Sequence, residues 1–190
     1  VPITVPTQSE PMPSMPGIAV IPIHGTLVRR AVGLDAASGL TSYARIAADI
    51  DAALAAPEVV GILLDIDSPG GEAGGVFELG ARIREASAIK PIWAHAGDAA
   101  FSAAYALACA TQRVSLSATG GVGSIGVIAL HIDQSVRNAR NGLSVTALTA
   151  GAHENDGTPH APLTPQATTA LQAEIDRLYA LFVAHVAQMR

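Results

Sequence analysis

The chain has 190 residues, 49% of them hydrophobic, which is enough for one well-packed domain and short for two. Its formal charge is −5 and it has no run of basic residues, so we expect no nucleic-acid partner, because phosphates attract clusters of Lys and Arg. The single cysteine, Cys109, excludes an internal disulfide framework and indicates a reducing compartment. No apolar run is long enough to span a membrane and no signal peptide is visible, so we expect a cytoplasmic protein.

The beginning of the chain differs in composition from the rest. Residues 1–16 contain five prolines and no periodic apolar pattern, which predicts an extended N-terminal arm. From residue 17 onward, short β-rich runs alternate with Ala-rich stretches of helical periodicity. This alternation predicts an α/β fold with parallel strands, formed by one domain over residues 17–190.

The expected elements follow from apolar periodicity and from helix-capping residues. The strands are expected at residues 17–23, 59–66, 91–95, 113–116, 124–130 and 145–148. The helices are expected from Thr41 or Ser42 to Pro57, from a turn at residues 68–71 to about Ser87, shortly after Ser102, at about residues 135–141, and from Thr164 to the end.

The final helix carries a clear start signal and an apolar stripe. Thr164 is a natural N-cap, and Pro165 sits in the first turn, where its missing N–H costs nothing. The stripe packs either on the core of the same chain or on a second subunit. Its members are Leu171, Ile175, Leu178, Phe182, Val186 and Met189.

Three segments have residues suited to chemistry. The sequence DSPGGE at residues 67–72 follows a buried strand, and its glycines allow a close approach and an anion or oxyanion site; an ordinary turn is the alternative. Ser102 lies among small residues at the start of a helix, which suits a nucleophile with the N–H of Ala103 beside it, or a simple helix cap. The glycine-rich residues 119–127 lack the lysine of a P-loop and precede a strand, so we expect no nucleotide site.

In this order and spacing, the three segments resemble the S49 family of signal-peptide-peptidase-like serine peptidases. The resemblance is carried by GILLDIDSPGG at residues 61–71, by the Ser102 segment and by GSIGV at residues 123–127. Residues 17–27, 38–43, 150–153 and 156–159 make it similar to the phage-head branch of that family, from residue 17 to the final helix. The resemblance implies a ClpP/crotonase-like fold with repeated ββα-type units and a C-terminal helix.

The resemblance also implies roles for particular residues. Ser102 is the nucleophile, Gly70 or Gly71 forms the oxyanion hole with Ala103, and Ser124 orients the general base. No cofactor and no metal are implied.

One position departs from the pattern of the family. The base of the family is a lysine about fifty residues beyond the serine, and that place is held here by Glu154, since 154 − 102 = 52. The only lysine, Lys90, is expected at the surface. A carboxylate is a weaker base than a buried amine and carries charge next to a forming oxyanion, so we expect impaired activity.

A histidine is the alternative base. His153 has Asp156 close to it, and His131, with Asp133 nearby, lies about where the ClpP-type triad has its histidine. The other histidines are expected at the surface or in satisfied core positions, and Cys109 as a small core residue.

The function expected from the resemblance is a serine endopeptidase that processes phage or prophage head proteins, or signal-peptide remnants. Its partners would be extended segments of scaffold, capsid or portal proteins, and copies of itself in a homo-oligomer or ring. One alternative is an inactive structural component of head assembly. Another is an acyl-CoA enzyme of the crotonase type, for which Glu72 and Glu154 are the only tempting carboxylates, but the sequence has no basic patch for the CoA phosphates.

Overall fold

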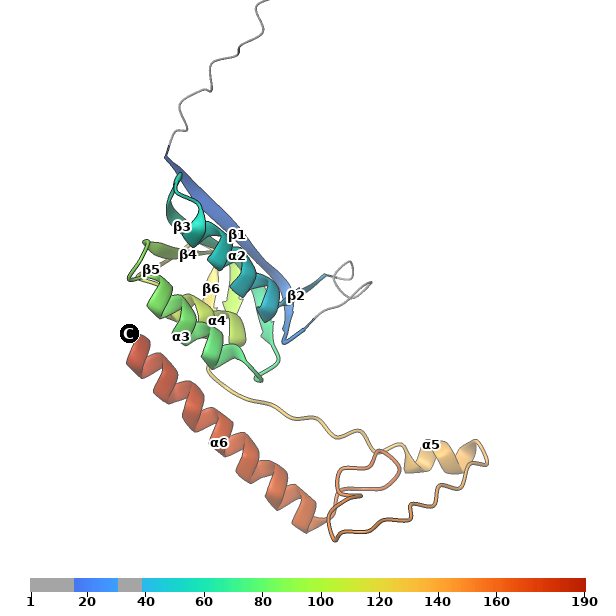
Figure 1. Ribbon diagram of the computed structural model, residues 1–190. Helices are drawn as coiled ribbons and strands as arrows, with labels where there is room; N and C mark the ends of the chain where they lie inside the picture. Colours follow the sequence, from blue (N-terminus) through green and yellow to red (C-terminus); the bar gives the residue numbers. More distant parts are fainter. Residues whose placement is uncertain (1–15, 31–38) are drawn as a thin grey trace, which may run out of the picture. The chain divides into compact units, whose positions relative to one another are not determined.

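The computed structural model describes residues 16–30 and 39–190 (Figure 1). Except for Pro16, the expected N-terminal arm lies outside the described residues. The chain divides into two compact units, one that extends to Val122 and one that comprises Gly123–Arg190, and each is described by itself. The single domain expected over residues 17–190 stays a prediction.

The first unit is built on a parallel sheet. Its strands follow the order β2-β1-β3-β4-β5, every neighbouring pair on this path is parallel, and β6 pairs with β4 outside it. This arrangement confirms the predicted α/β class. The strands are β1 (Gly17–Val28), β2 (Leu40–Ser42), β3 (Val59–Gly71), β4 (Ile92–Phe101), β5 (Arg113–Leu116) and β6 (Gly121–Gly123).

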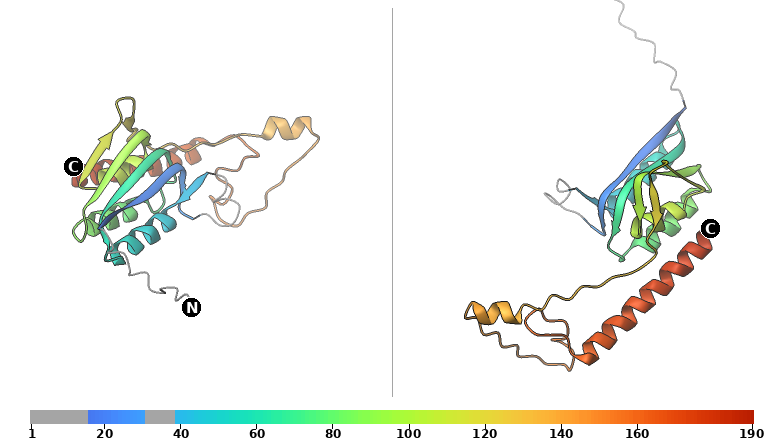
Figure 2. Two further views of the ribbon diagram at one scale, coloured as in Figure 1. Left: turned by 90° about the horizontal axis from the view of Figure 1, so that it is seen from above. Right: turned by 180° about the vertical axis from the view of Figure 1, so that it is seen from behind.

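Three helices of this unit, α2 (Tyr43–Ala55), α3 (Val76–Ala86) and α4 (Ala103–Cys109), lie along one face of the sheet (Figure 2). The strands alternate accordingly, with Ile21 and Ile23 buried and Val20 exposed along β1. Burial of the alternate residues of β1, β3 and β4 beneath the helices provides the hydrophobic core. Cys109 is completely buried there, as predicted for a small core residue.

Both ends of α2 are stabilised by side chains. At the start, the Oγ of Ser42 accepts a hydrogen bond of 3.2 Å from the N–H of Arg45. At the end, the Nζ of Lys90 donates to the carbonyl oxygens of Ala53 and Ala56 over 2.9 and 2.6 Å. The only lysine of the chain is therefore a cation at a helix C-terminus, where it satisfies carbonyl groups that lack an intrahelical partner.

Three strands are longer than their apolar patterns predicted. β1 was expected to end at Ile23 but continues to Val28. β3 was expected to end at Ile66 but continues through the SPGG sequence to Gly71, and β4 continues from the expected end at His95 to Phe101. The continuation of β3 pairs with β1, where Leu27 lies opposite Gly71 after a shift in register. Pairing with a neighbouring strand thus holds extended a sequence that has the composition of a turn.

The second unit contains α5 (Ser135–Arg140) and α6 (Pro165–Met189). The Oγ1 of Thr164 accepts a hydrogen bond of 3.0 Å from the N–H of Ala167, which confirms the predicted cap. Of the predicted stripe, Phe182 and Met189 are buried and Leu171 is 39% exposed. No helix among residues 16–30 and 39–190 has the length and apolar character to cross a bilayer.

Two strands predicted in this unit are not formed. Residues 124–130 and 145–148 belong to no strand (Figure 2). Their residue types suit a strand, but a strand forms only beside a neighbour that shares its hydrogen bonds. No segment of the described chain is paired with them.

Candidate active site

Ser102 occupies a sharp turn between a strand and a helix. β4 ends at Phe101, α4 begins at Ala103, and Ser102 between them has φ 50° and ψ −123°. Positive φ is rare for a residue other than glycine and is concentrated at functional sites. Among the described residues only Ser102 and Ser124 combine a side chain with positive φ, and both were predicted site residues.

The alternative that Ser102 is a simple helix cap is not supported. Its side chain makes no capping hydrogen bond to α4, whereas Ser42 and Thr164 both cap the helices that they precede. The turn instead presents a partly exposed hydroxyl at the end of a strand, as in the nucleophile elbow of hydrolases.

Gly70 lies directly against Ser102. A Cβ atom built on Gly70 would stand 2.7 Å from the Cβ of Ser102 and 3.0 Å from the backbone nitrogen of Ala103. Gly70 also has φ 104°, a conformation that favours glycine. The structure therefore brings together the SPGG segment, Ser102 and Ala103, which the sequence analysis had assigned to one site.

The backbone N–H of Gly70 already has a partner. It donates to the Oγ of Ser68 over 3.1 Å, and that hydroxyl donates in turn to the carbonyl oxygen of Gly25 over 2.6 Å. Ser68 is completely buried, and its hydrogen bond with the N–H of Gly70 is buried as well. The hydroxyl of Ser68 thus ties the SPGG segment to β1.

Gly71 packs against the backbone of β1. The N–H of Glu72 donates to the carbonyl oxygen of Leu27 over 2.9 Å, and Leu27 lies opposite Gly71 in the sheet. A Cβ atom built on Gly71 would stand 1.9 Å from the carbonyl oxygen of Leu27, so this position has no space for a side chain.

Glu72 and Tyr43 hold the end of the SPGG segment. The hydroxyl of Tyr43 donates to the carbonyl oxygen of Glu72, and the Oε2 of Glu72 accepts 2.7 Å from the N–H of Arg29. Burial, and second the charge of Glu72, raise the pKa of the Tyr43 phenol well above its ordinary value. The phenol therefore stays protonated and remains a donor.

Ser124 and Glu154 belong to the second unit. Ser124 is exposed and has φ 54°. Glu154 is exposed, and its Cγ lies 2.9 Å from the position of a Cβ built on Gly151. The roles of Ser124 and Glu154 stay predictions.

The two histidines considered as bases differ in their partners. His153 Nδ1 lies 3.0 Å from Asp156 Oδ2, so this predicted pair is formed, on an exposed surface. His131 Nε2 instead contacts the carbonyl oxygen of Ala161 over 3.2 Å. The carboxylate of Asp133 accepts from the N–H of Ser135 over 2.8 Å, and this hydrogen bond is the main cause of its lowered pKa.

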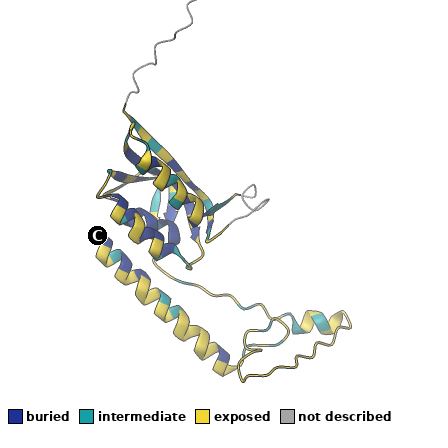
Figure 3. Ribbon diagram, viewed as in Figure 1, coloured by how far each residue is buried: buried dark blue, intermediate teal, exposed yellow. Residues whose placement is uncertain are grey.

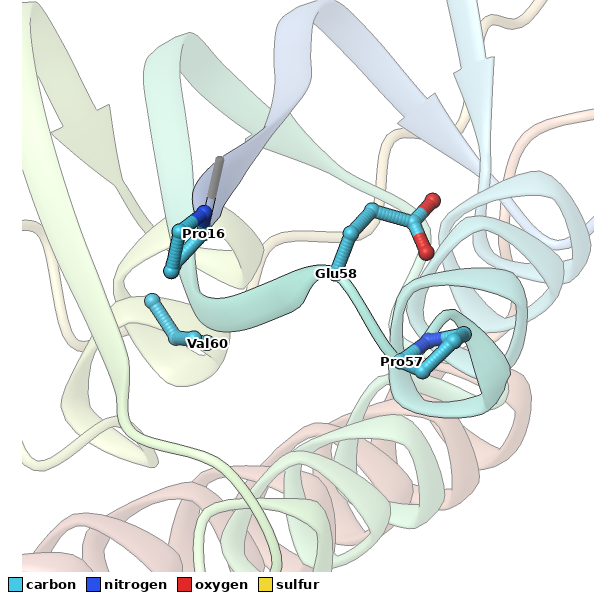
Figure 4. Close-up of a pocket in the computed structure, with 4 residues that line it drawn as sticks. All are labelled: Pro16, Pro57, Glu58 and Val60. Carbon is cyan, nitrogen blue, oxygen red and sulfur yellow. The ribbon is translucent and has the colours of Figure 1, made fainter. Parts of the chain in front are cut away.

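Two cavities of the first unit lie at opposite ends of the sheet. One of about 290 Å³ is lined by residues that include Arg29, Tyr43 and Gly75, beside the end of the SPGG segment. The other, of about 190 Å³, is lined by Pro16, Pro57, Glu58 and Val60 at the amino ends of β1 and β3 (Figure 4). Because Ser102 follows the carboxyl end of β4, only the first cavity lies at the same end of the sheet as the candidate site.

Ser68 and Glu72 lie in the DSPGGE segment that the sequence analysis singled out, but no role in the peptidase site was assigned to either of them, nor to Tyr43. A signal for Ser68 was present, because Ile62, Leu64 and Ile66 alternate as buried residues and Ser68 is the next position in that series. A polar side chain at a buried position of a strand needs a hydrogen-bond partner. Among residues 16–30 and 39–190, no group of three or more His, Cys, Asp or Glu side chains is placed to hold a metal ion.

Comparison with known proteins places these residues in a family. The sequence model of peptidase family S49 matches residues 84–190, which include Ser102, Ser124 and Glu154. Among solved structures, the chain resembles a mutant of the 1510-N membrane-bound stomatin-specific protease, with 17% identity, a TM-score of 0.42, and coverage of 85% of this chain and 60% of that one.

Two curated relatives come from bacteriophages. The head-tail preconnector protein GP5 of Enterobacteria phage P21 is 40% identical over 171 residues, which are 90% of this chain and 34% of the relative. The capsid assembly protease C of Escherichia phage lambda is 38% identical over 181 residues, which are 95% of this chain and 41% of the relative. The chain therefore spans less than half the length of either relative. It belongs to peptidase family S49.

Proposed function

We propose that this chain is the peptidase domain of a phage or prophage head-assembly protease, with Ser102 as its nucleophile. The observation that carries the proposal is the conformation of Ser102, which has positive φ, makes no capping hydrogen bond and lies against Gly70. The similarity to the lambda capsid assembly protease supports head proteins as substrates. Scaffold, capsid or portal segments would bind extended, in the cytoplasm of a bacterial host.

In the proposed mechanism, the hydroxyl of Ser102 attacks the carbonyl carbon of the scissile peptide bond while its proton passes to the general base. The C–N bond then breaks, the leaving amine takes that proton, and water hydrolyses the acyl-enzyme. The negative charge that develops on the carbonyl oxygen is stabilised by the N–H groups of Ala103 and Gly71. Gly71 is preferred to Gly70 because the N–H of Gly70 is already bonded to Ser68. Loss of one such donor typically reduces the rate by about 10²–10³-fold.

The general base is the weak component of this site. Glu154 stands where the family has lysine, and Ser124 is the residue proposed to orient that group. An exposed carboxylate is a poor acceptor for the proton of a serine hydroxyl, and its charge opposes the oxyanion. Loss of a positioned base reduces rates by about 10²–10⁴-fold, so we propose that activity is low.

The proposal is tested by the rate at which a fluorophosphonate labels the protein, together with cleavage of a denatured capsid or scaffold protein. We expect Glu154→Lys to react about 10²–10⁴-fold faster than the natural chain, because an amine replaces the missing base. Glu154→Gln is the matched control, since it removes the charge without supplying a base. Ser102→Ala must abolish labelling, which would identify the modified residue.

A second candidate, an inactive structural component of the phage head, is favoured by the carboxylate at position 154. The same experiment separates the two functions. If folded Glu154→Lys neither reacts nor cleaves, the structural function replaces the peptidase. If the natural chain reacts quickly through Ser102, a base other than a lysine at position 154 is present. The variants His153→Ala and Asp156→Asn then test whether His153, whose Nδ1 lies 3.0 Å from Asp156 Oδ2, is that base.

A further inference from the structure

Ser68 carries a buried hydroxyl group that the proposed mechanism does not use. In Figure 3 the strands and helices of the first unit hold most of the buried residues, and Ser68, which belongs to this unit, is completely buried. Burial removes the hydrogen bonds of a hydroxyl group to water, so each of them must be replaced. Along β3 the buried residues Ile62, Leu64 and Ile66 are thus followed by a serine whose hydroxyl calls for an explanation.

The pairing of β1 with β3 is irregular at this serine. The two strands are paired at His24 with Asp67, and next at Thr26 with Gly70. β1 therefore advances by 26 − 24 = 2 residues where β3 advances by 70 − 67 = 3. The extra residue makes a β-bulge, which disrupts the ladder of backbone hydrogen bonds and bends the strand, and bulges are over-represented next to active sites. Directly beyond this bulge lies Gly70, whose Cβ position is 2.7 Å from the Cβ of Ser102.

The hydroxyl of Ser68 fills the gap that the bulge leaves in the ladder. It accepts a hydrogen bond of 3.1 Å from the N–H of Gly70 and donates one of 2.6 Å to the carbonyl oxygen of Gly25. It thus joins a donor of β3 to an acceptor of β1 and supplies a partner to both. Gly25 itself has no freedom to move toward the β1–β2 connection, because a Cβ there would lie 2.2 Å from the carbonyl oxygen of Gly39. One end of the bridge is therefore anchored in β1, and the other end holds Gly70.

We propose that Ser68 is a positioning residue of the oxyanion hole, and that its hydroxyl sets the place of the peptide unit between Gly70 and Gly71 beside Ser102. This inference rests on the proposed function, in which the N–H groups of Gly71 and Ala103 bind the oxyanion. The peptide unit that follows Gly70 carries the N–H of Gly71, so the hold on Gly70 also fixes that donor. All of these residues belong to the first unit. A misplaced donor acts like an absent one, and the absence of one donor typically reduces the rate by about 10²–10³-fold.

A buried serine elsewhere in the same unit provides the matched control. Ser87 is 5% exposed, and its Oγ donates to the carbonyl oxygen of Ile83 over 2.8 Å at the end of α3. Ser68→Ala and Ser87→Ala therefore both remove a buried hydroxyl that donates to a backbone carbonyl group. Only Ser68→Ala also releases the N–H of Gly70. A role of Ser68 in the fold alone predicts the same result for both variants, whereas a positioning role predicts a difference.

The first measurement does not require activity. Amide hydrogen exchange of Gly70 is followed by NMR in the natural chain, Ser68→Ala and Ser87→Ala. We expect this amide to exchange at least about tenfold faster in Ser68→Ala, because it loses its acceptor, and at the natural rate in Ser87→Ala. Ser68→Cys keeps a side chain of similar size with a weaker acceptor, so it should lie between, and it replaces Ser68→Ala in the comparison if that variant does not fold. Unchanged exchange of Gly70 without the hydroxyl would overturn the proposal.

The second measurement is the rate at which a fluorophosphonate labels Ser102, with each variant placed in the Glu154→Lys background. We expect Ser68→Ala to lower the maximal labelling rate by at least about 10²-fold at an unchanged half-saturating concentration, because oxyanion donors act on the transition state rather than on binding. Ser87→Ala should leave both quantities unchanged. Equal losses in the two variants would show that Ser68 supports only the fold. A Glu154→Lys chain that is not labelled while Ser68 is in place would instead contradict the peptidase function, so the two failures are distinguishable.

Discussion

The contact between Gly70 and Ser102 leaves no space for a side chain. The Cβ position on Gly70 also lies 2.8 Å from the carbonyl oxygen of Phe101, so β4, the turn and α4 all approach the same glycine. Both residues have positive φ, which Gly70 adopts without strain and Ser102 does not.

Gly70→Ala is therefore expected to disturb the candidate site more than the fold. The added methyl group would displace Ser102 or Ala103, and we expect labelling of Ser102 in the Glu154→Lys background to fall by at least about 10²-fold, the cost of one lost oxyanion donor. Gly97→Ala is the matched control, because a Cβ there meets nothing within 4 Å. Equal labelling of the two variants would show that Gly70 does not shape the site.

At the scale of elements, the sequence predicted where strands and helices form better than how far they extend. The strand at residues 113–116 and the start of α6 agree with the structure; the start of α6 could be predicted because a Thr-Pro cap acts locally. The extension of β3 to Gly71 depends on Leu27 of β1, a partner distant in the sequence. The strand expected at residues 124–130 is not formed for the same reason. Its residue types suit a strand, but no segment of the described chain pairs with it.

The candidate site, too, could be predicted from the sequence only in part. Ser102, Gly70 and Ala103 were assigned through a resemblance, and the structure brings them together. The bridging hydroxyl of Ser68 could not be assigned, because its acceptor on Gly25 is set by the register of β1 against β3. Sequence patterns identify residue types at strand ends, but contacts across the sheet require the register.

The C-terminus of α2 provides a prediction at this scale. Lys90→Met removes a cation that donates to the carbonyl oxygens of Ala53 and Ala56 while keeping much of the side-chain bulk. We expect the free energy of unfolding to fall by about 1–2 kcal/mol, the contribution of hydrogen bonds from a charged group that is partly exposed. Lys90→Arg should restore most of it, and urea unfolding measures both. An unchanged midpoint for Lys90→Met would rule out the capping role.

At the scale of the whole molecule, the free energy of unfolding should fall at alkaline pH because of Tyr43. Its phenol has a pKa of 10.0 when unfolded and a higher one when folded. Below pH 10 both states hold the proton, so the stabilisation is fully present. Above that pH the unfolded state loses the proton first, and stability should decline as the pH rises toward the folded value.

The measurement is the free energy of unfolding of the natural chain and of Tyr43→Phe between about pH 8 and 11, a range that brackets the ordinary tyrosine pKa. Tyr43→Phe should be less stable at pH 8, because the carbonyl oxygen of Glu72 loses its donor, and should decline less steeply above pH 10. Tyr179→Phe, which removes a hydroxyl from a residue that is 48% exposed, is the control. Parallel curves for the natural chain and Tyr43→Phe would contradict the prediction.

The positive φ of Ser102 also bears on the history of the protein. Glycine would occupy this conformation without the strain of about 1–3 kcal/mol that a side chain adds. If the chain persisted through generations only as a building block, mutation would be free to drift toward glycine at this position and gain stability. Under the proposed function, selection for reactivity is what keeps a serine in this unfavourable backbone conformation, whatever residue now stands at position 154.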